Sequence, residues 1–306
     1  MGCGQDAGGE LVSSARDWYV TLRAANVPTV WADVLLGAGL AAGSAALDWP
    51  LAAVLAGISC LYLGGMAFND AVDIAFDQSN RSTRPVASGR ISPRAAMTAA
   101  SALLLAGFAS IATAEFGSAA SRWTMDAGVA LVVLISLYQW THRRSVILAA
   151  CFMAACRAAI PVIAALAVFG GVPVTVWVAA AAVGIWTIGI TMSGRGERGG
   201  ERTAGSGVAW FVVAALATIP MTLLRPNGDL AGMAAGLLIL LVAWIPAVHR
   251  RYAAGEAGRA VGWAVAGVAV LDSAMLLAGG LPVFSAAAIV CAAITLGGQR
   301  LGGGGS

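Results

Sequence analysis

The sequence predicts an all-α, polytopic membrane bundle. Of its 306 residues, 59% are apolar and only 11% are charged, whereas soluble domains average roughly 45–50% apolar and roughly 25% charged. Mean hydropathy is +0.83. Apolar runs of about 20 residues, the length that crosses bilayer hydrocarbon, recur along the chain. This composition indicates the lipid bilayer as the surroundings and gives no sign of a nucleic-acid partner.

Ten such runs are predicted, after an N-terminal segment, 1–26, that is glycine-rich and then interfacial. The second run continues as a helix to residue 77, and a Gly-Gly-Leu-Pro turn at 279–282 separates the last two. The tail 301–306 is interpreted as an added linker, which leaves 27–300 as the transmembrane domain. The runs cover roughly 27–47, 49–68, 93–115, 123–140, 145–168, 172–192, 207–224, 230–249, 260–279 and 282–298.

The arginines support this count. All 18 basic residues are arginine. With a cytoplasmic N-terminus, only Arg122 and Arg225 fall in segments on the far side, and Arg157 falls inside a span. The other arginines all face the cytoplasm, as the positive-inside rule requires. We therefore expect a protein of the bacterial inner membrane.

Acidic side chains gather where the second run ends. Asp70, Asp73 and Asp77 are spaced three and four residues apart, so a continuous helix puts the three carboxylates, flanked by Asn69, on one face. Such carboxylates repel one another unless a cation lies among them. Their hard oxygen atoms suit Mg²⁺, which completes its shell with water and substrate phosphate.

Two arginines follow this acidic face. Arg81 and Arg84 lie just downstream, and guanidinium groups bind phosphate well. The alternative is an ordinary solvated helix end, but acids at a helix C-terminus oppose the macrodipole and need a compensating reason.

The order Asn69-Asp70-x-x-Asp73-x-x-x-Asp77, followed by Arg84-Pro85 and Gly89-x-Ile91-Ser92, resembles the first motif of the UbiA superfamily of intramembrane prenyltransferases. The resemblance implies that this motif binds Mg²⁺ and the diphosphate of an isoprenoid donor. It also implies a UbiA-like bundle, usually of nine spans, so nine to ten transmembrane helices are expected here. The C-terminal region is also similar to UbiA-related proteins of bacterial Ebo gene clusters.

The resemblance extends to residues outside the first motif. It implies that Arg23 and Asn26, before the first span, face the active cavity; an interfacial anchor is the alternative. Tyr138 and Arg143 match the family's Tyr-x-x-x-Lys-Arg pattern, with His142 in place of the lysine. The alternative for this second pair, and the more usual explanation of a basic helix end, is ordinary positive-inside charge.

The family's second motif, usually Asp-x-x-x-Asp with glycine four residues on, corresponds to Glu197-x-x-x-Glu201-x-x-x-Gly205. The spacing is kept but the residue type is not. Two glycines, at 199 and 200, also weaken any helix that would align the pair. A second Mg²⁺ site and a charged loop are both open interpretations.

Arg157 lies in the middle of the fifth span. A charge at that depth costs on the order of 3 kcal/mol on insertion scales, so it needs a polar cavity or an anionic partner. In related sequences an arginine at this place faces the cavity, and a structural ion pair is the alternative. Asp272, deep in the ninth span, is a candidate partner, a ligand of metal-bound water or a base.

Three functions are considered. The first is a Mg²⁺-dependent prenyltransferase that ionises a prenyl diphosphate and passes the prenyl group to an aromatic or lipid acceptor, at a site facing the cytoplasm. The others are a UbiA-type terpene cyclase and a non-catalytic prenyl-lipid binding or transport protein. We assign catalytic roles to Asp70, Asp73, Arg157 and Tyr138, substrate binding to Asn69, Arg81, Arg84, Arg143, Arg23 and Asn26, and metal binding to Asn69, Asp70, Asp73, Asp77, Glu197 and Glu201.

Overall fold

The computed structural model describes residues 14–43, 47–79, 83–116, 122–195, 206–225 and 227–302. Throughout these residues the regular structure is helical, and ten helical stretches are long and apolar enough to cross a membrane. The predicted all-α polytopic bundle is therefore confirmed, with ten spans in the described part of the chain. The protein is an integral membrane protein.

Eight spans consist of essentially one α-helix each. They are α2 (Val27–Ala42), α3 (Trp49–Val72), α5 (Pro93–Thr113), α6 (Trp123–Thr141), α7 (Val146–Phe169), α8 (Val174–Arg195), α13 (Ala257–Ala278) and α14 (Pro282–Gly302). Short helical segments α1 (Ala15–Thr21), η1 (Ala24–Asn26), α4 (Ile74–Ser79) and η3 (Ala114–Phe116) lie between or before them. Helix α14 ends at Gly302, so it includes the first two residues of the tail 301–306 that was interpreted as an added linker.

Proline divides the two remaining spans. The seventh consists of α9 (Ser206–Ala215) and α10 (Thr218–Leu224), with Pro220 in the first turn of α10. The eighth runs from α11 (Leu230–Leu238) through a π-helical turn (Ile239–Trp244) into α12 (Ile245–Ala253), which has Pro246 in its first turn. Proline lacks an N–H group and its ring clashes with the carbonyl four residues back, which favours a break or a widened turn before it.

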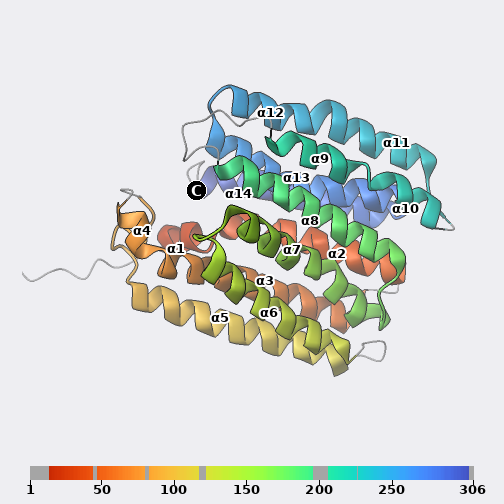
Figure 1. Ribbon diagram of the computed structural model, residues 1–306. Helices are drawn as coiled ribbons and strands as arrows, with labels where there is room; N and C mark the ends of the chain where they lie inside the picture. The colour runs from red at the N-terminus through yellow and green to blue at the C-terminus, as the bar shows by residue number, and fades with distance from the viewer. Residues whose placement is uncertain are drawn as a thin grey trace, which may run out of the picture.

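The bundle has two halves that meet along α2 and where α7 packs against α8. Helices α3, α5, α6 and α7 lie on one side, and α8 to α14 lie on the other (Figure 1). Helix α2 contacts α3 and α7 in the first half and α8, α13 and α14 in the second. Gly37 permits the close approach of α2 to α7, because a Cβ atom at this position would lie 2.1 Å from the Pro161 carbonyl oxygen.

The acidic residues at the junction of α3 and α4 lie at one end of the bundle. The segment α4, the short helix α1 and the end of α14 lie together at the left of Figure 1, and α12 also ends on this side. Helix α1 packs against both α3 and α14 there. Side chains from segments far apart in the sequence therefore surround Asp70, Asp73 and Asp77.

Candidate active site

The helix carrying the acidic residues bends at Asp73. We expected one helix through to Asp77, and this is wrong: α3 ends at Val72 and α4 begins at Ile74. Asp73 has φ −84° and ψ 0°, in the bridge region between the main allowed conformations. Its backbone N–H still bonds to the Asn69 carbonyl at 2.9 Å. The bend directs the three carboxylates to two different sets of partners.

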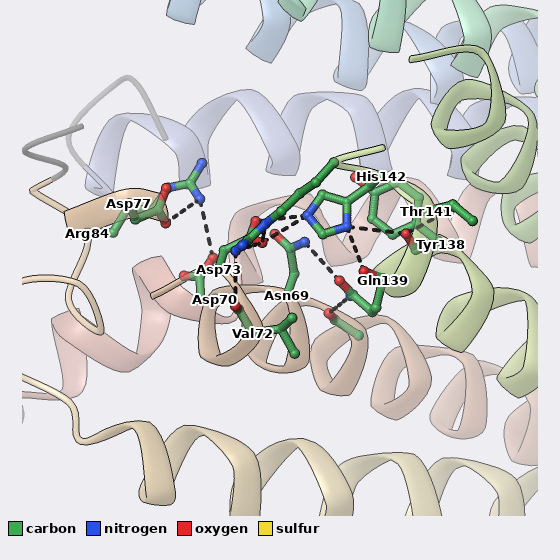
Figure 2. Close-up of polar contacts among 12 residues, drawn as sticks. Asn69, Asp70, Val72, Asp73, Asp77, Arg84, Tyr138, Gln139, Thr141 and His142 are labelled. Atoms are coloured by element: carbon green, nitrogen blue, oxygen red, sulfur yellow. Dashed lines mark hydrogen bonds and ion pairs between the residues drawn. The ribbon is translucent and has the colours of Figure 1, made fainter. Parts of the chain in front are cut away.

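Asp70 and Asp77 converge on one arginine. The Arg84 Nη1 atom lies 3.0 Å from Asp77 Oδ2 and 3.6 Å from Asp70 Oδ1 (Figure 2). Both carboxylates are buried. A second guanidinium, that of Arg23, lies 3.2 Å from Asp70 Oδ1. Asp70 and Asp77 thus share one cationic side chain.

Asp73 instead faces the end of α6. The His142 Nε2 atom lies 2.9 Å from Asp73 Oδ1 and 3.1 Å from Oδ2 (Figure 2). Arg143 donates from Nε to the same carboxylate at 2.7 Å and from Nη2 to the Val72 carbonyl at 3.0 Å. Burial alone raises the pKa of Asp73, but hydrogen bonds and charge from His142 and Arg143 outweigh it and lower that pKa. Asp73 is therefore favoured in its ionised form. Its contacts link the end of α6 to the bend between α3 and α4.

An amide pair joins the same two helices one turn deeper. Asn69 donates to the Gln139 Oε1 atom at 3.0 Å, and Gln139 donates to the Gly65 carbonyl at 3.1 Å. Tyr138 stacks on His142 with ring centroids 5.2 Å apart. Figure 2 shows Asn69, Gln139, Tyr138 and His142 in one continuous group beside the acidic residues. The carboxamide of Asn69 is thereby fixed in orientation.

An apolar pocket lies between α2, α3, α6 and α7 beneath this group. Its volume is about 90 Å³. Polar groups enter it from Gln139, Tyr62, Tyr138 and Arg157, and the remaining walls are mainly aliphatic, including Ile58, Leu131 and Ile160. Two of the residues assigned to catalysis, Tyr138 and Arg157, therefore share one pocket.

Arg157 also has an anionic partner that the sequence analysis missed. Its Nε atom lies 2.5 Å from Asp33 Oδ2, and the Asp33 side chain is fully buried. Asp272 is buried as well and interacts electrostatically with both residues. Arg157 thus has the anionic partner that was expected, and it also lines the apolar pocket, while its catalytic role stays a prediction. The signal for Asp33 was available, since it is a charge inside the first apolar run.

Arg23 and Asn26 differ in their surroundings. Arg23 reaches Asp70 and also donates from Nη1 to the Met66 sulfur at 3.1 Å. Asn26 accepts a hydrogen bond from Gln299 of α14 at 2.9 Å. Arg23 therefore belongs to the acidic group, whereas Asn26 connects the start of the first span to the last helix.

The donor set includes one pair of carboxylates, Asp70 and Asp77, that suits Mg²⁺, and the metal role assigned to Asp73 stays a prediction. Asp70 and Asp77 offer hard oxygen atoms around a position that a cationic side chain already approaches. Mg²⁺ usually takes one or two carboxylates and keeps water or substrate phosphate for the rest of its shell. Asp73 is turned toward His142, and among the described residues no three His, Cys, Asp or Glu side chains form a metal-binding group.

Three residues assigned from the sequence fall outside the described residues: Arg81, Glu197 and Glu201. They stay predictions. Among the described residues, Gln139 was missed, and His142 was recognised only as a substitution for lysine. An amide and an imidazole near the polar end of a membrane helix are common, so their spacing alone did not indicate their partners on α3.

The chain was compared with known proteins. The model of the UbiA prenyltransferase family matches residues 26–260. No curated protein sequence matches the chain. A structure of a UbiA homologue from Archaeoglobus fulgidus bound to DMAPP and Mg²⁺ is similar, with a TM-score of 0.64, 14% identity, and coverage of 90% of this chain and 99% of that one.

A second structure, of a UbiA homologue from Aeropyrum pernix K1 without ligand, has a TM-score of 0.64 and 16% identity over 82% of this chain and 96% of that one. These identities show a shared fold. The family match, in turn, covers well over half of the sequence. The chain therefore belongs to the UbiA prenyltransferase family.

Proposed function

We propose that this protein is an intramembrane enzyme that cleaves a prenyl diphosphate with Mg²⁺ and transfers the prenyl group to an acceptor. The convergence of Asp70 and Asp77 on Arg84 carries this proposal, together with an apolar pocket whose lining on α3 ends at Met66, about one turn before Asp70. Family membership and the Archaeoglobus fulgidus homologue bound to DMAPP and Mg²⁺ support it. The arginine-rich end of the bundle, and with it the site, would face the cytoplasm.

The carboxylates and the arginines would have different roles in binding the diphosphate. Asp70 and Asp77 would hold Mg²⁺, which neutralises diphosphate charge as the C–O bond breaks. Arg84 is placed to move from the carboxylates to a phosphate oxygen, because guanidinium binds both groups in the same geometry. Arg23 and Arg143 lie on either side and add positive charge for the leaving group.

Asp73 would act through its neighbours. It holds the imidazole of His142 and the guanidinium of Arg143 at fixed positions next to the bend. Asn69, fixed by Gln139, presents its carboxamide from the preceding turn. These contacts preorganise the site before the donor arrives, which reduces the reorganisation required during the reaction.

The apolar pocket would hold the prenyl group. Tyr62 and Tyr138 line it, and aromatic faces stabilise cations through cation–π attraction. Engineered apolar cavities of about 150 Å³ bind benzene. A pocket of about 90 Å³ is smaller than such a cavity, so a prenyl group would enter it as the lining side chains move apart.

The same aromatic lining favours a second candidate, a UbiA-type terpene cyclase, in which the allylic cation reacts with its own chain. Incubation of the protein in nanodiscs with Mg²⁺ and prenyl diphosphates of three lengths separates the candidates. Pyrophosphate release with a prenylated acceptor supports a transferase, and a cyclic hydrocarbon supports a cyclase. Mg²⁺-dependent donor binding without pyrophosphate release would contradict both and indicate a binding protein.

A further inference from the structure

A large cavity lies beside the acidic group, on the side of the second half of the bundle. It has a volume of about 640 Å³, within the range of roughly 300–1,000 Å³ that is usual for ligand sites. Its walls come from α1 and η1, from the end of α12, from the start of α13 and from the end of α14. None of the three acidic residues of the first motif lines it.

Four arginines line this cavity: Arg23, Arg251, Arg259 and Arg300. One carboxylate, Glu256, accompanies them, and it lies 3.3 Å from Arg259. The lining is therefore strongly cationic. Positive charge at this end of the helices follows the general membrane rule, but that rule does not require the arginines to surround a common cavity.

Arg251 is held in place by its contacts, and Arg23 has an unusual backbone conformation. Arg251 stacks on Trp263, with the guanidinium carbon 3.8 Å from the ring centroid, and donates to the Ala247 carbonyl at 2.8 Å. Arg23 has a left-handed backbone, with φ 47° and ψ 43°, which is uncommon for a residue other than glycine. Such backbone conformations concentrate at functional sites.

Part of the cavity lining is apolar. Val261 and Val265 of α13, Leu296 of α14, and the rings of Tyr19 and Trp263 line it along with the arginines. A ligand that matches both parts of the lining has an anionic head, such as a phosphate or carboxylate, and an apolar body. Arginine binds both head groups through two parallel hydrogen bonds.

Arg23 connects this cavity to the diphosphate site. The same guanidinium lines the cavity and lies 3.2 Å from Asp70. A ligand in the cavity is consequently next to the group that would hold the donor. That position suits the second reactant of the transfer.

We propose that this arginine cavity binds the acceptor, an amphiphilic anion with a phosphate or carboxylate head. This rests on the proposed function. A nucleophilic oxygen or carbon of the acceptor forms a bond to the first carbon of the prenyl group while the bond from that carbon to the diphosphate oxygen breaks. The diphosphate leaves with the electron pair, and the acceptor gives one proton to water.

Matched ligand pairs test the binding. Lysophosphatidic acid is compared with the monoacylglycerol of the same chain, and a fatty acid with its methyl ester, by binding to the full-length protein in nanodiscs without donor. We expect each anionic member to bind about tenfold or more tightly than its neutral partner, since charge-assisted hydrogen bonds are roughly twice as strong as neutral ones. The pair with the larger difference identifies the head group. Equal binding within both pairs would overturn the proposal.

Arg251→Gln and Arg300→Gln locate the site, because glutamine removes the charge and keeps hydrogen-bond donors. Each should abolish most of the preference for the anion, while Arg94→Gln, an exposed arginine in the first turn of α5 that does not line the cavity, should keep it. Arg300 is exposed in the last turn of α14, so its variant should fold even if Arg251→Gln does not. Unchanged preference in folded Arg300→Gln would contradict the assignment.

The same preparations separate this proposal from the proposed function. With donor and Mg²⁺ added, prenylation of the bound anion supports its role as acceptor. Charge-selective binding with pyrophosphate release but no prenylated anion would overturn that role and leave donor cleavage intact. Absence of pyrophosphate release in the wild-type protein would instead contradict the proposed function, whatever the binding result.

Discussion

His142 Nε2 lies 2.9 Å from the Asp73 carboxylate, although 69 residues separate the two in the sequence. The contact joins the end of α6 to the bend between α3 and α4. It accounts for the different orientation of Asp73 relative to Asp70 and Asp77. Asp73 therefore shapes the site by fixing a histidine and an arginine.

The first prediction concerns this contact. Asp73→Asn and His142→Gln should each destabilise the protein. The double variant should lose less free energy of unfolding than the sum of the losses in the two single variants. Coupling between contacting residues is typically about 0.5–3 kcal/mol. Thermal unfolding in detergent measures it, with His249→Gln, an exposed histidine on α12, as the control. Strict additivity would show that the contact makes no contribution.

The lowered pKa of Asp73 gives the pH dependence of this effect. A carboxylate whose pKa is lower in the folded protein stabilises the fold fully above its unfolded pKa, about 3.9, and loses that contribution as pH falls through the folded value. The destabilisation by Asp73→Asn should thus be largest at neutral pH and shrink below about pH 4. A difference that grows on acidification would contradict the assigned contacts.

The second prediction concerns Arg84, which lies between Asp70 and Asp77. Replacement by methionine leaves two buried carboxylates without this cation. Arg84→Met should bind Mg²⁺ more tightly than the wild type when no donor is present, by calorimetry in nanodiscs. It should also release pyrophosphate at least about tenfold more slowly, because a leaving-group contact is lost. Unchanged Mg²⁺ affinity would show that the metal does not use this position.

The third prediction concerns the buried pair of Arg157 and Asp33. Arg157→Met leaves a buried carboxylate without its main partner, which typically costs about 3–5 kcal/mol. The unfolding temperature in detergent should fall sharply, and the added change Asp33→Asn should restore part of it. Arg144→Met, at an exposed position on the α6–α7 turn, provides the control. Equal, small effects of Arg157→Met and Arg144→Met would rule out a structural pair.

The fourth prediction concerns orientation in the membrane. Single cysteines at Arg90, Arg198 and Arg251 on a cysteine-free background should be labelled from the cytoplasmic side. Cysteines at Asn227 and Gly279 should be labelled from the opposite side. An impermeant thiol reagent applied to intact cells distinguishes the two. Labelling of position 198 from outside would contradict the ten-span arrangement.

Much of this architecture is readable from the sequence because span length, arginine distribution and proline positions are local properties. The acidic spacing likewise placed Asp70 and Asp77 near each other, and in the structure both approach Arg84. The direction of Asp73 was not readable, because it depends on contacts with His142 and Arg143 that form only when α3 and α6 pack together. Spacing within one helix carries no information about such partners.

The ion pair of Arg157 shows a different case. The sequence indicated that a mid-span arginine needs an anion, and Asp272 was considered for this role. The partner closest to the Arg157 guanidinium in the structure is Asp33, a residue that the same reasoning would have found. What the sequence does not supply is which of two buried carboxylates a given arginine approaches, since that depends on how α2 packs against α7 and against α13.

The central claim is that Asp70 and Asp77 hold the metal and diphosphate of a prenyl donor. The most direct test compares Mg²⁺-dependent pyrophosphate release by the wild type, by Asp77→Asn, and by Asp126→Asn, an exposed carboxylate in the first turn of α6. We predict a loss of more than about 100-fold in Asp77→Asn, as expected for a metal ligand, and wild-type release in Asp126→Asn. Near-normal release by correctly folded Asp77→Asn would contradict the account.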